Sequence, residues 1–350
     1  MLTNEQLKEI REHLENAKNP VFFYDNDPDG MCSFVLLQRF LGRGKGVIIK
    51  SMPGLDKSYF KKVEEFKADY VFVLDKPVIN QDFIDLVDGA NIPLVVIDHH
   101  NVPKPKTKYY YNTFYESGKT EPVSYLCYKI TGRKEDEWIV LIGCITDSYV
   151  PDFLARFKEE RPELIDFNYK TAFDILYNTK FGKIAMIVSF GIKDSTTNVV
   201  AMSRFLIQAN DANDILEENV KTKIFLKRYE EINKKYQVIL KKSEEHITKE
   251  MVFFTYSGDL SINQYVSNEL FYRHPDKVIV TIYTKGNIAN LSLRWRGDIR
   301  TATVNAIKDI EGASGGGHEH ATGARMPADK LQEFKEKLLK EIDKIKSKKS

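Results

Sequence analysis

Short apolar runs alternate with amphipathic segments along the first hundred or so residues of the chain. Four runs are rich in Val, Ile, Leu and Phe, at 21–24, 47–49, 70–74 and 94–97. Apolar residues recur at helical spacing in the segments near 3–17, 34–40, 57–66 and 81–88. Short apolar runs of this kind are typical of strands buried on both faces. Their alternation with helices predicts a parallel sheet with helices on both faces, an α/β fold.

The rest of the chain divides into a helical middle and a second, smaller sheet. A short aromatic strand is predicted at 109–111, followed by helices at 122–131 and 135–147, and the pattern stays helical to about 246. The charged stretch 226–245 predicts a long amphipathic helix that joins two units. Further strands are predicted at 252–254, 278–280 and 288–293, with helices at 261–272, 299–310 and 327–345. We therefore expect an N-terminal domain at 1–190, a helical connector at 191–250 and a smaller C-terminal α/β domain at 251–350.

Polar side chains follow three of the predicted strands where each strand ends. The run 94–97 leads into Asp98, His99 and His100, the run 21–24 leads into the segment 25–30, and the run 70–74 leads into Asp75. Acids and imidazoles are costly to bury unless they are paired or bind metal. Because ligands of open parallel sheets bind at the carboxyl ends of the strands, we expect these side chains to converge on one crevice. Divalent metal ions are the natural compensation for so many carboxylates.

The segment Asp25-Asn26-Asp27-Pro28-Asp29-Gly30 places three acids at alternate positions. In extended chain, residues two apart point to the same side, so the three carboxylates form a site for a hard cation. The alternative is an Asp-rich turn closed by Gly30. An EF-hand is excluded, because the stretch after Gly30 that should supply an acid is apolar.

Adjacent histidines after an acid are unusual at the end of a buried strand. Successive side chains point in opposite directions, so one imidazole of His99 and His100 can bind metal while the other faces a substrate. Asp98 can orient one of them by accepting its hydrogen bond. Asp75 and Asp147 are each weak evidence alone. In a doubly wound sheet both would reach the same crevice, where one carboxylate can bridge two metals roughly 3.5–4 Å apart.

A glycine-rich segment near the C-terminus has two interpretations. Gly315, Gly316 and Gly317 precede His318, and three glycines let backbone amides approach an anion. Arg294, at the end of a predicted strand, is a candidate phosphate-binding side chain. The alternatives are a flexible loop for the glycines and an exposed sheet edge for the arginine.

Composition excludes some classes of protein. The formal net charge is only +2, so any surface that binds nucleic acid must be locally basic. No run approaches the ~18 apolar residues of a membrane span, so we expect no membrane partner. Cys32, Cys127 and Cys144 are not at metal-binding spacing and are typical of buried thiols in a reducing cytoplasm.

Together these residues resemble the DHH phosphoesterase superfamily, in the subfamily that carries a DHHA1 domain. The resemblance extends over nearly the whole chain: segment 25–30 is similar to the first motif, Asp75 to the second, 98–100 to the third and Asp147 to the fourth. The glycine-rich segment with Ala321 and Gly323 is similar to the DHHA1 signature. Many members begin the first motif with His. Asp25 in that position, together with the chain length and helical middle, is more similar to the archaeal RecJ-like exonucleases, which include a helicase-associated type.

The resemblance implies a role for each of these residues. It implies two divalent ions, usually Mn²⁺ with Mg²⁺ or Co²⁺ as alternatives. One ion would be held by Asp25, Asp27 and Asp75, and the other by Asp29, Asp75, His99 and Asp147. A water between the ions would be the nucleophile. Asp98 and His100 would act at the scissile phosphate, and Arg294, the three glycines and His318 would bind the substrate.

Three functions remain open from the sequence. The first is an exonuclease on single-stranded DNA or RNA, with a role in DNA repair and a helicase, a replication protein or a second copy of the chain as partner. The second is a phosphodiesterase acting on very short oligonucleotides, adenosine bisphosphate or cyclic dinucleotides. The third is a non-catalytic subunit that binds a replication or repair partner, although the intact set of acids argues against it.

Overall fold

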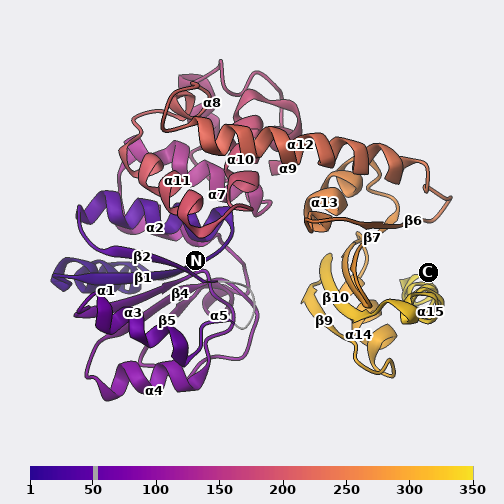
Figure 1. Cartoon of the computed structure of the whole chain (residues 1–350), viewed down its shortest axis with the longest axis horizontal. Coiled ribbons are helices and arrows are strands. Elements are labelled where there is room, and N and C mark those ends of the chain that lie inside the picture. Colours follow the sequence, from indigo (N-terminus) through magenta and orange to yellow (C-terminus); the bar gives the residue numbers. More distant parts are fainter. Residues whose placement is uncertain (50–53, 350) are drawn as a thin grey trace. The chain divides into compact units, whose positions relative to one another are not determined.

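The chain forms two compact units in the computed structural model, which describes residues 1–49 and 54–349 (Figure 1). The first unit is Met1–Glu230 and the second is Glu231–Ser350, and the boundary falls within the long helix α12 (Lys223–Glu244). The finer division into 1–190, 191–250 and 251–350 stays a prediction. Among the described residues, no helix combines the length and the apolar character needed to cross a membrane.

The N-terminal unit is built on a five-stranded parallel sheet with strand order β2-β1-β3-β4-β5. Its strands are β1 (Pro20–Asp25), β2 (Lys45–Ile49), β3 (Tyr70–Leu74), β4 (Leu94–Asp98) and β5 (Tyr109–Asn112). Its helices before α12 are α1 (Asn4–Asn16), α2 (Pro28–Leu41), α3 (Phe60–Glu65), α4 (Gln81–Gly89), α5 (Thr113–Ser117), α6 (Val123–Thr131), α7 (Glu137–Thr146), α8 (Leu154–Glu160), α9 (Ala172–Asn178), α10 (Lys180–Gly191) and α11 (Thr196–Gln208).

Both faces of this sheet are covered by helices, as the sequence predicts. Along β1, Val21 and Phe23 pack into the cluster that includes Phe83 of α4. The alternate residues Phe22 and Tyr24 point the other way and contact Phe34 of α2. Figure 1 shows α2 on one side of the sheet and α3 and α4 on the other. Since both faces are buried, the strands are apolar throughout rather than alternating with polar residues.

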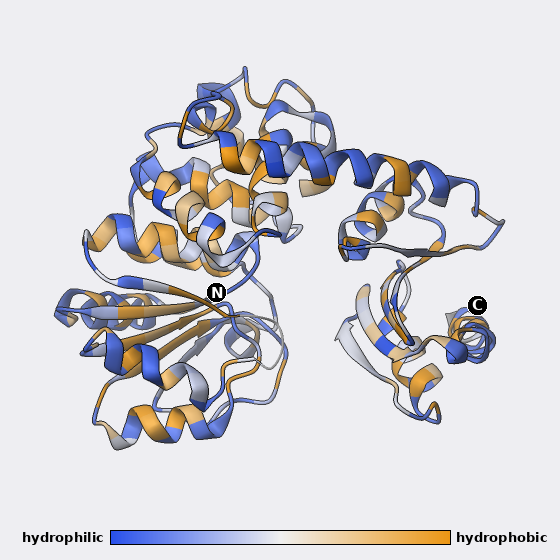
Figure 2. Ribbon diagram, in the orientation of Figure 1, coloured by the Kyte–Doolittle hydropathy of each residue, from blue (hydrophilic) through white to orange (hydrophobic). Residues whose placement is uncertain are grey.

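Helices α6 to α11 complete the N-terminal unit. Residues of α7 from Glu137 to Ile145 are buried, as are nearly all of those of α10, so these helices are apolar on all sides. Figure 2 shows this difference, with orange along the inner helices and mostly blue along α12. The burial of α7 fixes the position of Asp147, the residue that directly follows the helix.

The C-terminal unit has a mixed sheet with strand order β6-β7-β8-β10-β9. Its elements are β6 (Met251–Ser257), α13 (Asn263–Arg273), β7 (Val278–Lys285), β8 (Ile288–Arg294), α14 (Ile299–Ile307), β9 (Ser314–His318), β10 (Ala321–Pro327) and α15 (Leu331–Lys349). Strands β6 and β7 are parallel and the other pairs are antiparallel. Val280 and Ile282 pack with Phe334 of α15, whereas Thr281 points to the opposite face and donates to Asn263 of α13.

The glycine-rich segment is a strand, so its interpretation as a loop was wrong. Strand β9 pairs with β10, with Gly316 opposite Gly323. A Cβ at Gly315 would lie 2.7 Å from the Gly323 carbonyl oxygen, and one at Gly317, where φ is +142°, would lie 2.5 Å from that of Ala321. Glycine has a low propensity for strands, and here it is required by the close approach of two backbones. The sequence reasoning also missed β10 and the short helix α5.

Candidate metal centre

The candidate centre lies at the carboxyl ends of three adjacent strands of the N-terminal unit. Asp25 is the last residue of β1, Asp98 is the last residue of β4, and Asp75 directly follows β3, which lies between them. The sequence predicts this convergence, because the carboxyl ends of parallel strands meet at one edge of a sheet.

Asp75 leaves its strand in a strained conformation. Its φ is +57°, in the left-handed region that non-glycine residues rarely adopt, while its backbone N–H still donates to the carbonyl of Ile97 at 3.0 Å. Its side chain is 1% exposed. Strain of this kind is found at functional sites, where the surrounding structure enforces it. The turn holds the carboxylate at the centre of the cluster.

His99 brings two acids together. Its Nε2 lies 3.2 Å from Oδ1 of Asp75 and 3.5 Å from Oδ2 of Asp147, the residue that ends α7. Ligand atoms of Asp75, His99 and His100 lie within 4.8 Å of one another, and so do those of Asp29, His99 and Asp147. The structure thus brings these five predicted residues to within the reach of a metal ion.

Buried polar atoms in this cluster lack partners. Among the described residues, neither Oδ1 of Asp75 nor Nδ1 of His99 has a hydrogen-bond partner, although both are buried. A buried polar atom without a partner costs about 1–3 kcal/mol. Metal coordination would satisfy the Asp75 oxygen, so the residues present fit a divalent cation.

The carboxyl groups are strongly perturbed. Burial, followed by the charges of neighbouring aspartates, raises the pKa of Asp27 to about 7 and holds the pKa of Asp75 well above its usual range. Burial also raises the pKa of Asp147 to about 6, against the opposing effect of His99. Crowded carboxylates disfavour one another's ionisation, and a cation reverses this.

Two aspartates of the first motif also have structural roles. Oδ1 of Asp27 accepts from Gly30 N at 2.9 Å and caps α2. The carboxylate of Asp29 accepts from the backbone N–H groups of Val123 and Ser124, at 2.7 and 3.0 Å, and from the Ser124 hydroxyl. Asp29 therefore holds the N-terminus of α6 against the site. Its remaining lone pairs face the candidate cation group with His99 and Asp147.

His100 is held by an acid and an amide. Its Nδ1 lies 2.8 Å from Oδ1 of Asp98, and Oδ2 of Asp98 accepts from Nδ2 of Asn112 at 3.1 Å. The same amide donates to the His100 carbonyl at 3.0 Å. Burial disfavours the imidazolium, but the hydrogen bond and charge of Asp98 outweigh it and raise the pKa of His100 to about 9. Asp98 therefore favours the protonated form of His100.

Asp25 has a basic partner. Nζ of Lys76 lies 2.6 Å from Oδ1 of Asp25, and the Lys76 side chain is only 5% exposed. Gly30 makes room for this turn, since a Cβ there would lie 2.6 Å from the Asp25 carbonyl oxygen. The sequence predicts Asp25 as a metal ligand, whereas the structure pairs it with Lys76.

Lys76 and Asn112 are the functional candidates that sequence reasoning missed. Each had a signal. Lys76 directly follows Asp75, and a lysine after a buried strand is as unexpected as an acid. Asn112 ends β5, so it obeys the same strand-end rule that identified Asp98.

The predicted substrate residues lie together in the C-terminal unit. Arg294 on β8 and His318 on β9 are both paired in register with Ala321 of β10, so they occupy one row across three strands. Arg294 donates through Nε to Oδ1 of Asn268 at 2.7 Å and through Nη1 to the Leu293 carbonyl at 2.7 Å. Gly315, Gly316 and Gly317 precede His318 on β9, which lies at the sheet edge and offers one side of its backbone to a ligand.

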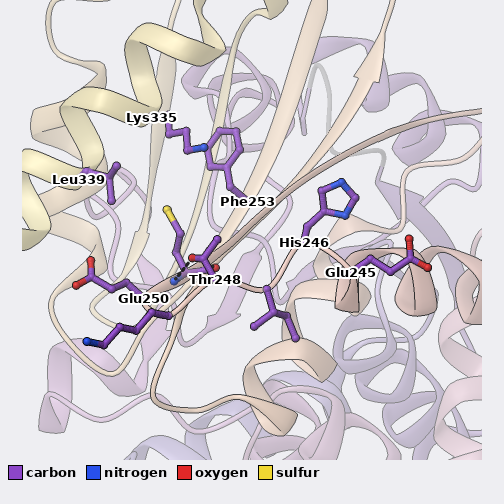
Figure 3. A pocket seen from close by; sticks show the side chains of 10 residues that line it. Glu245, His246, Thr248, Glu250, Phe253, Lys335 and Leu339 are labelled. Carbon is purple, nitrogen blue, oxygen red and sulfur yellow. Dashed lines mark hydrogen bonds between the residues drawn. The ribbon is translucent and has the colours of Figure 1, made fainter.

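A separate hollow of about 650 Å³ lies on the C-terminal unit (Figure 3). Its lining includes His246, Phe253 and Lys335. Lys335 Nζ lies 4.8 Å from the centre of the Phe253 ring, and Nδ1 of His246 contacts the Lys242 carbonyl at 3.0 Å. None of the predicted site residues lines it. This hollow is therefore not part of the candidate centre.

The fold and the site define a class of α/β protein in which acids and imidazoles gather at the carboxyl edge of a parallel sheet and a smaller α/β unit follows. Within that class, the chain carries a DHH family N-terminal domain at residues 21–144 and a DHHA1 domain at residues 258–344. The first match contains every candidate residue from Asp25 to His100, and Asp147 lies just beyond it.

Solved structures with the same fold include two of RecJ and one of a phosphodiesterase. An exonuclease RecJ bound to manganese is 16% identical with a TM-score of 0.63, over 96% of this chain and 94% of that chain. RecJ from Thermus thermophilus, in complex with Mn²⁺, is 16% identical with a TM-score of 0.66, over 96% of this chain and 54% of that chain. The pGpG-specific phosphodiesterase PggH from Vibrio cholerae is 12% identical with a TM-score of 0.51, over 94% of this chain and 100% of that chain. No curated protein matches the sequence.

Proposed function

We propose that this protein is a metal-dependent phosphodiesterase that removes nucleotides from the end of single-stranded DNA or RNA. One observation carries the proposal: buried Asp75 and His99 converge with the partly exposed Asp147, and the buried Oδ1 of Asp75 makes no hydrogen bond there. The DHH and DHHA1 domains support the same reaction class.

The proposed ligands follow from the cluster. Asp29, Asp75, His99 and Asp147 would hold one divalent ion, and Asp27 and Asp75 are the carboxylates for a second, with Asp75 shared. We propose Mn²⁺ as the ion, with Mg²⁺ or Co²⁺ as alternatives. The two RecJ structures with the same fold contain Mn²⁺. When bound, such ions polarise a phosphoryl oxygen and make water a nucleophile at neutral pH. The resemblance also assigns Asp25 to the second ion.

His100 and Asp98 would act on the phosphate itself. The imidazolium of His100 is a hydrogen-bond donor with a positive charge, suited to a phosphoryl oxygen that gains charge in the transition state. Asp98 and Asn112 fix the orientation of the ring and maintain its charge. Loss of Asp98 would therefore reduce catalysis through His100 rather than through the metal.

The substrate strand would be bound by the C-terminal unit. Arg294, His318 and the exposed backbone of Gly315, Gly316 and Gly317 offer charge and backbone N–H groups to phosphates. Trp295, which directly follows β8, is buried in the core of this unit, so its ring is not available to stack on a base. A helicase or replication protein as partner, a homo-oligomer, a DNA repair role and a cytoplasmic location stay predictions.

A second function is favoured by the near-neutral net charge of +2. Tight binding of long strands usually requires a basic surface, so a phosphodiesterase for very short oligonucleotides remains the alternative. The intact acid cluster argues against a purely binding subunit.

Substrate length separates the two enzymes. The test is manganese-supported digestion of single strands of graded length, DNA and RNA, labelled at either end. A groove that stacks successive bases gains roughly 1–3 kcal/mol for each added base, so we expect kcat/KM to rise steeply from two to about six nucleotides and then level. Fastest turnover on dinucleotides would reject the exonuclease and favour the short-substrate enzyme, whereas no hydrolysis at any length would reject both.

A further inference from the structure

Lys76 is a buried cation inside the candidate metal centre. Its ammonium lies 2.6 Å from Oδ1 of Asp25, and its side chain is 5% exposed, compared with 22% for Asp25. Lysine is rarely buried unless it is paired, so this contact accounts for its position. The ammonium contacts one of the acids that the family resemblance assigns to a metal.

The contact is built into the backbone. Tyr24 of β1 pairs in register with Leu74 of β3, so Asp25 and Lys76 lie one and two residues beyond a matched pair. The left-handed turn at Asp75 makes the side chains of Asp75 and Lys76 point in different directions. As a result, Asp75 faces His99 while Lys76 faces Asp25.

We propose that Lys76 acts as a tethered cation that removes Asp25 from the metal-ligand set, so that the chain holds one divalent ion tightly and a second only weakly. That these ions are divalent metals rests on the proposed function. A divalent metal held by Asp25 would bind directly to an oxygen of this carboxylate. An ammonium hydrogen bonded to the same carboxylate would place two positive charges close together, where they repel.

The grouping of ligand atoms supports a centre in which the two ion positions differ in affinity. Across the described residues, the clusters of three or more that are able to hold an ion are Asp75, His99 and His100, and Asp29, His99 and Asp147. Both contain His99, and neither contains Asp25 or Asp27. The tight ion therefore belongs on the His99 side, and the Asp25 side already has a positive charge.

The test counts bound manganese in the full-length protein. Metal-free wild type, K76M and K106M are titrated with Mn²⁺, with bound ions counted by native mass spectrometry and their coupling read by electron paramagnetic resonance. Lys106 is an exposed lysine of the same unit, so K106M controls for the loss of one positive charge. Wild type and K106M should bind one ion tightly and give the spectrum of an isolated Mn²⁺.

K76M should bind its second ion roughly 10- to 100-fold more tightly than wild type does, a typical range for changes next to metal ligands. Its spectrum should show coupling between two ions roughly 3.5–4 Å apart. Two equally tight, coupled ions in wild type, or a folded K76M that binds metal as wild type does, would overturn the proposal.

D25N provides a second test that does not depend on the folding of K76M. Its amide oxygen still accepts from Lys76, so it should keep the tight ion with unchanged affinity. Loss of that ion would show that Asp25 is a ligand and reject the inference. The proposed function is judged separately, by whether wild type hydrolyses single strands with manganese at all. Hydrolysis by a protein with two tight ions would reject only the inference.

Discussion

At the scale of single residues, the candidate centre is a set of crowded carboxyl groups that disfavour one another's ionisation. Asp27, Asp75 and Asp147 all have raised pKa values, because burial and mutual repulsion favour their protonated forms. His100 differs, because its partner Asp98 is held beside it and favours its charged form.

These shifts predict how the metal-free protein responds to pH. An acid whose pKa is raised in the folded chain destabilises that chain progressively as pH rises from its ordinary pKa to the raised value. For Asp27 this window extends from 3.8 to about 7. His100 acts in the same direction, because its stabilising charge is lost as pH rises from 6.5 to about 9. Stability without metal should therefore fall as pH rises across this range.

D27N isolates the contribution of Asp27. Asparagine also caps helices, so α2 should keep its cap while the charge is lost. In thermal melts with a chelator, D27N and wild type should differ little near pH 3.5, below the ordinary pKa of the carboxyl, and D27N should melt a few degrees higher at pH 8. Saturating Mn²⁺ should stabilise wild type more than D27N. A constant difference between the two proteins at all pH values would contradict the assignment.

The position of a single residue at the edge of the sheet is predictable where a polar side chain ends an apolar run. Asp25, Asp75 and Asp98 could be identified in this way, since their strands are unmistakable. Lys76 could not be assigned a partner, because the left-handed turn at Asp75 is not visible in the sequence. The hydrogen bonds of Asp29 to α6 depend on residues more than ninety positions away, so no local pattern reveals them.

At the scale of elements, α7 must pass very close to Asp29. A Cβ at Gly143 would lie 2.3 Å from Oγ of Ser124 and 2.9 Å from Oδ1 of Asp29. Glycine in the middle of a helix costs about 1 kcal/mol relative to alanine. Its presence in α7 is explained by this approach, which brings α6, α7 and the first motif together.

G143A should therefore destabilise the protein despite its better helix propensity. Overpacking costs about 1–3 kcal/mol, which outweighs the gain in propensity, so we expect a net loss of about 1 kcal/mol together with weaker Mn²⁺ binding through displaced Asp29. G89A is the matched control, since nothing lies within 4 Å of a Cβ at that position of α4. Denaturant melts and manganese titration measure both effects. Equal behaviour of the two variants would show that Gly143 is not required by the close approach.

Elements are predictable when their side chains carry a hydrophobic pattern. The parallel strands and the long helix α12 lie close to their predicted positions for this reason. Strand β9 has three glycines in five residues, so it has no side-chain pattern to read. Its pairing with β10 is a tertiary feature that overrides low propensity.

At the scale of the whole molecule, the proposed metal ligands and the proposed substrate-binding residues belong to different units. His99 and its acids are in Met1–Glu230, whereas Arg294 and His318 are in the unit that begins at Glu231. This division predicts that binding of metal and binding of substrate respond to different mutations.

H318A tests that separation. It should weaken binding of a single-stranded oligonucleotide about tenfold, or about 1.4 kcal/mol, and leave Mn²⁺ affinity unchanged. Fluorescence anisotropy and calorimetric titration measure the two affinities. H246A, an exposed histidine of the same unit beside the hollow in Figure 3, should change neither. A large loss of manganese affinity in H318A would contradict the division of roles.

The most direct measurement is manganese-dependent hydrolysis of a labelled single strand by wild type, D75A and the control D88A, an exposed acid on α4. Wild type and D88A should hydrolyse the strand with Mn²⁺ and stop when a chelator is added. D75A should keep its fold by circular dichroism yet lose more than about 100-fold in rate, beyond the loss expected for residues that only support a metal ligand. Substantial manganese-dependent activity in D75A, or wild-type activity that resists the chelator, would contradict the account.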